Sequence, residues 1–258
     1  MSGNNKSINQ SVVKAFELLQ AFSSDKKEWG VRELALKTGY NKSTTYRLLN
    51  TLTSLNVVHQ NRADKYVLGA KLFELGNRVP IYKTLRRLTH DIIQDVALEI
   101  QETVLLSVLR SQQVFHIDKA DSQYGLKINT AVGSYEALHA TASGKLLLAF
   151  SNSRAQNQIL NHVSLTRFSK NTICEVGELK EELEKIKNQG YALDIEESES
   201  GLVCIAIPVR NAYGKTIASL SASGPLSRFK MEKISDYIAM LSRGLDAVEM
   251  GLKDFEEL

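Results

Sequence analysis

Residues 31–55 read VRELALKTGYNKSTTYRLLNTLTSL, and this stretch decides the fold of the first part of the chain. Apolar residues at helical spacing predict a short helix over 31–38, and Gly39 then allows the positive φ of a tight turn. Asn41 is a suitable N-cap for a longer helix over 42–55. A short helix, a glycine turn and a second helix in this order are typical of a helix-turn-helix.

The second of these helices separates an apolar side from a polar side that carries no acidic residue. We expect the buried side to consist of Leu48, Leu49, Leu52 and Leu55. The opposite side holds Ser43, Thr44, Arg47, Asn50, Thr51 and Ser54. Acidic side chains would repel phosphate, whereas hydroxyl groups and arginine can approach the base edges in a groove. This helix is therefore the expected recognition helix of a DNA-binding unit.

The flanking segments complete a winged helix-turn-helix. Residues 9–22 predict a helix whose inward face consists of Val12, Val13, Phe16, Leu19 and Phe22. After the recognition helix, apolar runs at 57–60 and 66–68 enclose a polar turn and predict a hairpin, the wing. Arg62 and Lys65 near its tip are candidates for contacts with phosphate or the minor groove. The pattern alone also allows a three-helix scaffold that binds protein through the same face.

Charge is distributed unevenly along the chain. Of the 258 residues, the first 69 hold ten Lys or Arg and five Asp or Glu, a net charge of +5, whereas the remainder has a net charge of −2. A basic unit at one end is suited to a polyanionic partner, because each phosphate contact releases counterions.

The remaining sequence predicts a linker helix and an α/β domain. A short apolar helix near 69–76, which packs within the chain or pairs with its twin in a dimer, precedes Pro80 and a long amphipathic helix over 81–101. Strand-like runs occur at 103–109, 113–119, 126–132, 190–195, 202–209 and 215–223, and helical runs at 143–151, 154–162, 175–188 and 230–252. We expect an antiparallel or mixed sheet covered by helices. The expected domains are 8–69, the linker 70–83 and 84–255.

Small polar residues within apolar segments indicate a pocket in the second domain. Residues 140–144, Ala-Thr-Ala-Ser-Gly, lead directly into a helix, whose free N–H groups favour an anion such as a carboxylate. Asp194 ends one strand, Cys204 lies within another, and Ser221 and Ser223 share one face of a third. Together these groups would line a compact pocket. Alternatively, the serines bond their own backbone and Cys204 is a small core residue.

Composition excludes several classes of protein. A hydrophobic content of 43% and a charged content of 24% rule out a mostly disordered chain and a disulfide scaffold. No run of about 18 apolar residues and no apolar core of a signal peptide are present. We therefore expect no membrane span and a cytoplasmic location, in keeping with two cysteines that are distant in sequence.

Two alternative functions have weaker support. Cys204, His139 and Asp194 can be imagined as the nucleophile, base and orienting group of an enzyme, but burial in an apolar strand raises the pKa of a thiol. The five histidines show no metal-ligand spacing, although scattered residues can meet in space in a metal-dependent sensor. We expect neither an enzyme nor a cofactor or metal site, and we expect His139 to be a hydrogen-bonded core residue.

Separate stretches along nearly the whole chain match the motifs of one known protein family. The first half carries the matching stretches SVVKAFELL (11–19), KSTTYRLL (42–49) and YVLG (66–69), the last leading into Lys71-Leu72. The second half carries LHATASGK (138–145), GYALD (190–194), GLVCIA (201–206) and SASGP (221–225) with Arg228. By the number of these stretches and their order, the chain specifically resembles the IclR family of bacterial transcription regulators.

The resemblance implies a GAF-like effector domain that binds small organic molecules, often carboxylic, keto or aromatic acids, in a dimer or tetramer that acts as repressor, activator or both. The effector contacts that it implies are Ala142, Ser143, Asp194, Cys204, Ser221 and Ser223, with Ile128 and Leu202 as apolar walls. The sequence departs from the family two residues before His139, where proline is frequent and Ala137 stands here. Glu136 precedes it and would repel a second carboxylate of a ligand.

Taken together, these observations predict an α/β two-domain, ligand-responsive DNA-binding regulator of transcription. We expect a repressor that binds double-stranded operator DNA and a small-molecule effector as a homo-oligomer. The expected DNA-binding residues are Lys42, Ser43, Thr44, Thr45, Tyr46, Arg47, Asn50, Arg62 and Lys65.

Overall fold

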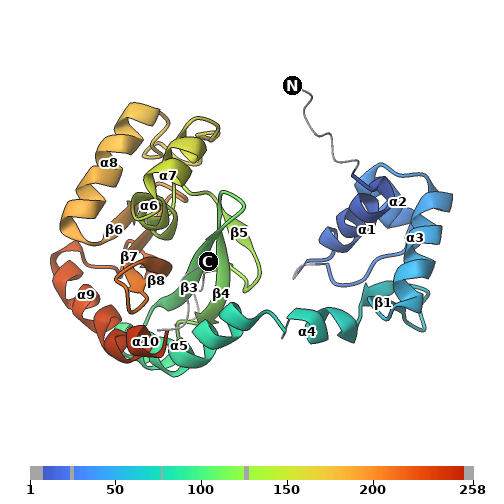
Figure 1. Ribbon diagram of the computed structural model, residues 1–258, viewed down its shortest axis with the longest axis horizontal. Coiled ribbons are helices and arrows are strands. Elements are labelled where there is room, and N and C mark those ends of the chain that lie inside the picture. Colours follow the sequence, from blue (N-terminus) through green and yellow to red (C-terminus); the bar gives the residue numbers. More distant parts are fainter. Residues whose placement is uncertain (1–7, 24–25, 77, 125–127, 253–258) are drawn as a thin grey trace. The chain divides into compact units, whose positions relative to one another are not determined.

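The chain divides into two compact units, one up to Pro80 and one from Ile81. The computed structural model describes residues 8–23, 26–76, 78–124 and 128–252 (Figure 1). The division between the units falls inside the segment 70–83 that the sequence indicates as a linker.

The first unit is a helix-turn-helix followed by a hairpin. Its elements are α1 (Gln10–Gln20), α2 (Val31–Thr38), α3 (Lys42–Ser54), β1 (Val58–Gln60), β2 (Tyr66–Leu68) and α4 (Ala70–Gly76). Gly39 ends α2 with φ of 73°, and the Asn41 side chain accepts a hydrogen bond from the Thr44 N–H, which caps α3. The predicted helices and wing are confirmed, with ends that shift by one or two residues.

The inward face of α1 differs from the prediction. Val12 and Phe16 are 54% and 60% exposed, whereas Leu18 is fully buried. The core-facing stripe is Ala15, Leu18, Leu19 and Phe22, which also has helical spacing, so the helix carries two apolar faces and only one meets the core. Leu55 is likewise 56% exposed, because α3 ends before it.

A glycine is required where the wing leads into α4. The Gly69 N–H donates to the Val57 carbonyl at 2.8 Å. A Cβ atom on Gly69 would lie 2.3 Å from the Asn56 carbonyl oxygen, closer than any side chain can approach. Glycine at position 69 therefore lets the chain pass directly against the backbone of Asn56 and Val57 as it leaves the hairpin for α4.

The second unit is built on one six-stranded antiparallel sheet in the order β5-β4-β3-β8-β7-β6. The strands are β3 (Thr103–Arg110), β4 (Gln113–Ala120), β5 (Tyr135–Glu136), β6 (Ala192–Ile195), β7 (Leu202–Arg210) and β8 (Thr216–Pro225). The interior strands β7 and β8 are buried along almost their whole length, as expected of a sheet covered on both faces.

Helices cover both faces of this sheet (Figure 1). One layer consists of α6 (Ala142–Ala149), α7 (Ser153–Leu160) and α8 (Val176–Gln189), and the other of α5 (Pro80–Ile100), a 3-10 turn (Met231–Lys233), α9 (Ile234–Ser242) and α10 (Leu245–Gly251). The result is an α/β domain with two hydrophobic cores separated by the sheet. The predicted antiparallel or mixed sheet with helices packed against it is confirmed.

Two predicted elements are wrong. Residues 128–132 form no strand, and 126 and 127 lie outside the described residues; the strand beside β4 comes later, at Tyr135–Glu136, after a turn at Gly133 with φ of 88°. The predicted helix over 230–252 is interrupted at Gly244, which has φ of 82°. A left-handed residue cannot continue a right-handed helix, so α9 and α10 are separate.

Candidate DNA-binding face and effector cavity

The outer side of α3 presents most of the candidate DNA-binding residues to solvent. The exposed ones are Lys42, Ser43, Tyr46, Arg47 and Asn50, and Thr44 is half-buried. The Asn41 carboxamide oxygen accepts from the Thr44 N–H and from the Ser43 hydroxyl, both at 2.8 Å. This capping orders the start of the helix, where recognition helices contact bases.

Thr45 does not belong to that face. Its side chain has no exposed surface, and its hydroxyl donates to the Asn41 carbonyl at 3.1 Å. Thr45 lies between Thr44 and Tyr46 on the core side of α3, a position that helical periodicity alone can identify. It stabilises the turn rather than presenting a group to DNA.

The wing carries two exposed cations at its tip. Arg62 and Lys65 are exposed on either side of Asp64, which has φ of 55°. The Asn61 side chain accepts from the N–H groups of Ala63 and Lys65 at 3.0 and 3.1 Å and holds the turn closed. The cations therefore extend from an ordered hairpin.

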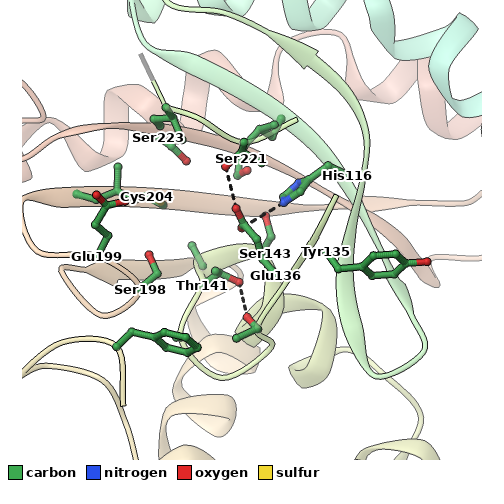
Figure 2. A pocket seen from close by; sticks show the side chains of 18 of the residues that line it. His116, Tyr135, Glu136, Thr141, Ser143, Ser198, Glu199, Cys204, Ser221 and Ser223 are labelled. Atoms are coloured by element: carbon green, nitrogen blue, oxygen red, sulfur yellow. Dashed lines mark hydrogen bonds and ion pairs between the residues drawn. The ribbon is translucent and has the colours of Figure 1, made fainter. Parts of the chain in front are cut away.

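The second unit contains a cavity of about 520 Å³ on the α6 side of the sheet. Its lining comes from β3 to β5 with the segment 128–130 between β4 and β5, from the start of α6, from Phe168, and from residues 198–199 with strands β7 and β8. Figure 2 shows Ser221, Ser223, Cys204, Ser143, His116 and Glu136 gathered around it. Of the residues that the sequence indicates for the effector, Ile128, Ala142, Ser143, Leu202, Cys204, Ser221 and Ser223 line the cavity.

The start of α6 forms one wall of the cavity. The Thr141 hydroxyl accepts from the Gly144 N–H at 3.1 Å and donates to the Ala137 carbonyl at 2.9 Å. Ala142 and Ser143, in the first turn, line the cavity. A Cβ atom on Gly144 would lie 2.4 Å from the Leu138 carbonyl oxygen, so glycine lets the preceding segment pass against the helix. The positive end of the helix dipole faces the cavity.

Small polar side chains on the sheet form the opposite wall. Cys204 on β7 is the register partner of Ser223 on β8. Ser221 lies two residues before Ser223 and points to the same face of the sheet. Burial raises the pKa of the Cys204 thiol well above its ordinary value, and the Asp194 carboxylate raises it further. The thiol therefore stays protonated, a weak hydrogen-bonding group rather than a nucleophile.

An acid–base pair lies at the β4–β5 end. The buried His116 ring contacts the Ser107 hydroxyl through Nδ1 at 2.8 Å and approaches Glu136 Oε2 with Nε2 at 3.1 Å. Thr130 donates its hydroxyl to Glu136 Oε1 at 2.8 Å. Burial raises the pKa of Glu136, but the interaction with His116 and the hydrogen bond from Thr130 lower it by more. The pKa of Glu136 therefore lies below its ordinary value. Glu136 is therefore an ionised carboxylate at neutral pH.

Asp194 is not among the residues that line the cavity. It is fully buried, and its carboxylate accepts from the N–H groups of Glu197 and Ser198 at 2.7 and 3.3 Å and from the Ser198 hydroxyl at 2.5 Å. Burial raises its pKa despite these bonds. Asp194 thus holds the loop that brings Ser198 and Glu199 to the cavity.

Several lining residues were not identified from the sequence. His116 carried a weaker signal than Cys204, because it is a polar residue between apolar Phe115 and Ile117 in a strand that also holds Gln113, Asp118 and Lys119. Phe168 carried no signal, because it lies in a segment between helices and reaches the cavity through the fold alone. His139 is a core residue as expected: its Nε2 lies 2.9 Å from the Thr166 carbonyl, and its ring 5.7 Å from Phe168.

Comparison with known proteins identifies the family. Residues 11–62 match the IclR helix-turn-helix domain, and residues 77–249 match the domain described as bacterial transcriptional regulator IclR C-terminal. The chain belongs to the IclR family. The regulator KdgR of Escherichia coli is 38% identical over 95% of this chain and 94% of its own length, and XynR of the same organism is 30% identical over 92% and 94%.

Solved structures of IclR proteins share the two-domain layout. The Thermotoga maritima IclR is 31% identical with a TM-score of 0.74, over 94% of this chain and 98% of that one. An IclR homologue from Microbacterium hydrocarbonoxydans, complexed with 4-hydroxybenzoate, has a TM-score of 0.85 over 94% of this chain and 99% of that one. At 22% sequence identity this is a similarity of fold. The chain is thus an IclR-family transcriptional regulator with a DNA-binding helix-turn-helix and an effector domain.

Two negative observations apply to the described residues. Among them, no three His, Cys, Asp or Glu side chains are grouped as metal ligands. No helix in the described part of the chain is both long and apolar enough to span a membrane.

Proposed function

We propose that this IclR-family regulator is a repressor whose DNA affinity is controlled by a small organic acid bound in the α6 cavity. The observation that carries the proposal is the cavity itself, with the N-terminal turn of α6 on one wall and the hydroxyl groups of Ser221 and Ser223 on another. N–H groups at a helix start and nearby hydroxyls together suit a carboxylate. The role of repressor is supported by a relative named the transcriptional repressor IclR of Escherichia coli, 27% identical over 93% of this chain.

The ionised Glu136 restricts the acid that fits. A ligand whose carboxylate lies at the α6 start faces a second negative charge at Glu136, which repels a dicarboxylate and accepts hydrogen bonds from hydroxyl groups. The expected effector is a monocarboxylic acid that bears a hydroxyl group or another donor. The 4-hydroxybenzoate in the complex of the Microbacterium protein makes hydroxybenzoates a rational part of a screen.

The proposed DNA contacts divide into base readout and phosphate binding. Arg47, with Ser43, Thr44, Tyr46 and Asn50, reads the major groove from the exposed side of α3. Lys42, Arg62 and Lys65 contact phosphate. A homodimer would place two such helices on half-sites about one helical turn apart.

Substitution of Arg47 tests the DNA-binding assignment. Arg47→Ala should weaken binding to a duplex that the wild type selects from a random library by about 10- to 100-fold, because one bidentate base contact contributes about 1–3 kcal/mol. Because the side chain is exposed, the thermal stability should not change. The matched variant Lys65→Ala should weaken binding to all sequences equally and reduce the salt dependence. An unchanged Arg47→Ala footprint would show that α3 does not read DNA.

A thermal-shift screen of keto, hydroxy, aromatic, sugar and dicarboxylic acids tests the effector assignment. A ligand at 100 times its Kd adds about 2.7 kcal/mol of stability, and Tm rises by about 2–4 °C for each kcal/mol. We expect monocarboxylic hydroxy acids to shift Tm and dicarboxylates to fail. Ser221→Ala should abolish the shift, whereas Ser227→Ala, at an exposed serine outside the cavity, should retain it. A shift that survives in Ser221→Ala would locate the ligand elsewhere.

A further inference from the structure

A bulge in strand β4 places His116 and Asp118, which are two residues apart, on opposite faces of the sheet. Leu106 pairs with Asp118, but the next residue, Ser107, pairs with His116, so β4 has one extra residue, Ile117. His116 and Asp118 are two positions apart and would share a face in a regular strand. The bulge instead turns His116 to the cavity and Asp118 to the α5 side.

The edge strand β5 has the same double orientation in only two residues. Glu136 pairs with Val114 and contacts His116, on the cavity side. Its neighbour Tyr135 pairs with Phe115, and the two rings are 4.9 Å apart. Figure 2 shows the Tyr135 ring directed away from the cluster that contains Glu136 and His116. A shift of β5 therefore displaces groups on both faces at once.

Two far-face residues of β4, Phe115 and Asp118, contact one stripe of α5. The Tyr82 ring lies 5.8 Å from Phe115. Asp118, with 1% of its surface exposed, is reached by Arg86 Nε at 3.3 Å and by His90 Nδ1 at 2.8 Å. Tyr82, Arg86 and His90 are four residues apart and so follow one another on a single helix face. β4 thus holds three successive turns at the beginning of α5.

We propose that β5 and the bulged β4 couple ligand binding in the cavity to the first turns of α5. The Glu136–His116 pair receives the signal, and the stripe of Tyr82, Arg86 and His90 transmits it. This rests on the proposed function, since it concerns how the effector changes DNA affinity. The position of α5 in the chain makes the coupling useful, because the helix begins at Pro80, where the first unit ends.

The physical basis is competition at a weakly held strand. A ligand hydroxyl that donates to Glu136 competes with the ion pair to His116 and with the hydrogen bond from Thr130. β5 has two residues and pairs with β4 alone, so few contacts oppose its movement. The resulting change in DNA affinity is limited to the ligand's preference for one arrangement over the other.

A double-mutant cycle tests the coupling without a ligand. Glu136→Gln alters the cavity end, and Tyr82→Leu removes the aromatic contact at α5. DNA affinity is measured on the duplex selected by the wild type. Glu136→Gln should change Kd at least about five-fold in the wild-type background, a typical allosteric coupling. The change should disappear in the Tyr82→Leu background, because the two sites no longer communicate.

Two further variants separate coupling from a general structural effect. Tyr82→Phe keeps the ring and should retain the full response to Glu136→Gln. Tyr213→Leu changes an exposed tyrosine in the β7–β8 turn and should leave the response intact. Hydrogen exchange provides a second readout: Glu136→Gln should increase amide exchange in residues 82–90, and Tyr213→Leu should not.

The outcomes distinguish this proposal from the proposed function. If Glu136→Gln leaves Kd unchanged, or changes it equally in the wild-type and Tyr82→Leu backgrounds, the coupling through β5 is wrong. If the wild type selects no duplex, or if its binding is insensitive to Arg47→Ala, the DNA-binding assignment itself fails. Unaltered exchange in residues 82–90 of Glu136→Gln would overturn the role of α5 regardless of DNA binding.

Discussion

At the scale of single residues, an ion cluster links α6 to α8 and to the loop after β6. Lys145, on α6, is 1% exposed, and its Nζ lies 2.5 Å from Glu197 Oε1 and 3.4 Å from Glu182 Oε1. Burial raises the pKa of Glu197 to about 7, although Lys145 opposes the rise. A lysine buried this deeply requires an acidic partner, since an unpaired charge in the interior is strongly destabilising.

The raised pKa of Glu197 predicts a pH-dependent stability. Glu197 binds its proton more tightly in the folded chain than in the unfolded chain, where the pKa of the glutamate side chain is 4.5. The resulting stabilisation is fully present below pH 4.5 and is lost as the pH rises through about 7. Urea unfolding at several pH values should show the free energy of unfolding falling over this window more steeply in the wild type than in Glu197→Gln. Equal slopes for the two proteins would show that Glu197 does not titrate there.

At the scale of elements, local sequence signals explain why most helices and strands were predicted. Asn9, Asn41 and Thr141 cap α1, α3 and α6 with their own side chains, and such caps are visible in the sequence. Gly39 and Gly190 end α2 and α8 in the left-handed conformation. The errors arose where contacts distant in sequence decide, as in the short β5, which exists only because it pairs with β4.

The cap of α6 yields a prediction about a single element. Thr141→Ala removes both bonds of the hydroxyl, to the Gly144 N–H and the Ala137 carbonyl, in a helix whose residues are all buried. The free energy of unfolding should fall by about 1–2 kcal/mol, as for other lost N-caps. Thr141→Ser keeps the hydroxyl and is the matched control. Urea denaturation measures both variants, and a loss of similar size in Thr141→Ser would attribute the effect to the methyl group instead.

At the scale of the whole molecule, the second apolar face of α1 suggests how the protein self-associates. Val12 and Phe16 lie four residues apart on one side of the helix and are 54% and 60% exposed. In α4 no side chain is buried. Exposed apolar side chains that are neighbours on a helix are typical of an interface. We propose that the exposed apolar face of α1 and the helix α4 pair with the same elements of a second copy of the chain. Of the two alternatives for α4, packing within the chain or pairing with its twin, this favours the second.

Sedimentation velocity tests this proposal. Phe16→Ser should weaken self-association at least about ten-fold, because about 1.5–3 kcal/mol of apolar burial is lost from each interface side chain. Leu98→Ser alters a leucine on α5 that is 53% exposed and should leave the oligomer intact. If Leu98→Ser dissociates the protein and Phe16→Ser does not, the interface lies on the second unit. A wild type that remains monomeric at all concentrations contradicts the homo-oligomer.

The sequence by itself determined most of the helices and strands, because caps, periodicity and turn glycines act over a few residues and survive as readable patterns. Its motif stretches, in their order along the chain, determined the family. It also indicated the α6 start and the serines of β8, which are small polar residues in apolar surroundings. Only the tertiary structure decided which apolar face of α1 is buried, that Asp194 supports a loop instead of lining the cavity, and that His116 and Glu136 meet. Each of these depends on segments far apart in the chain, whose contacts no local pattern encodes.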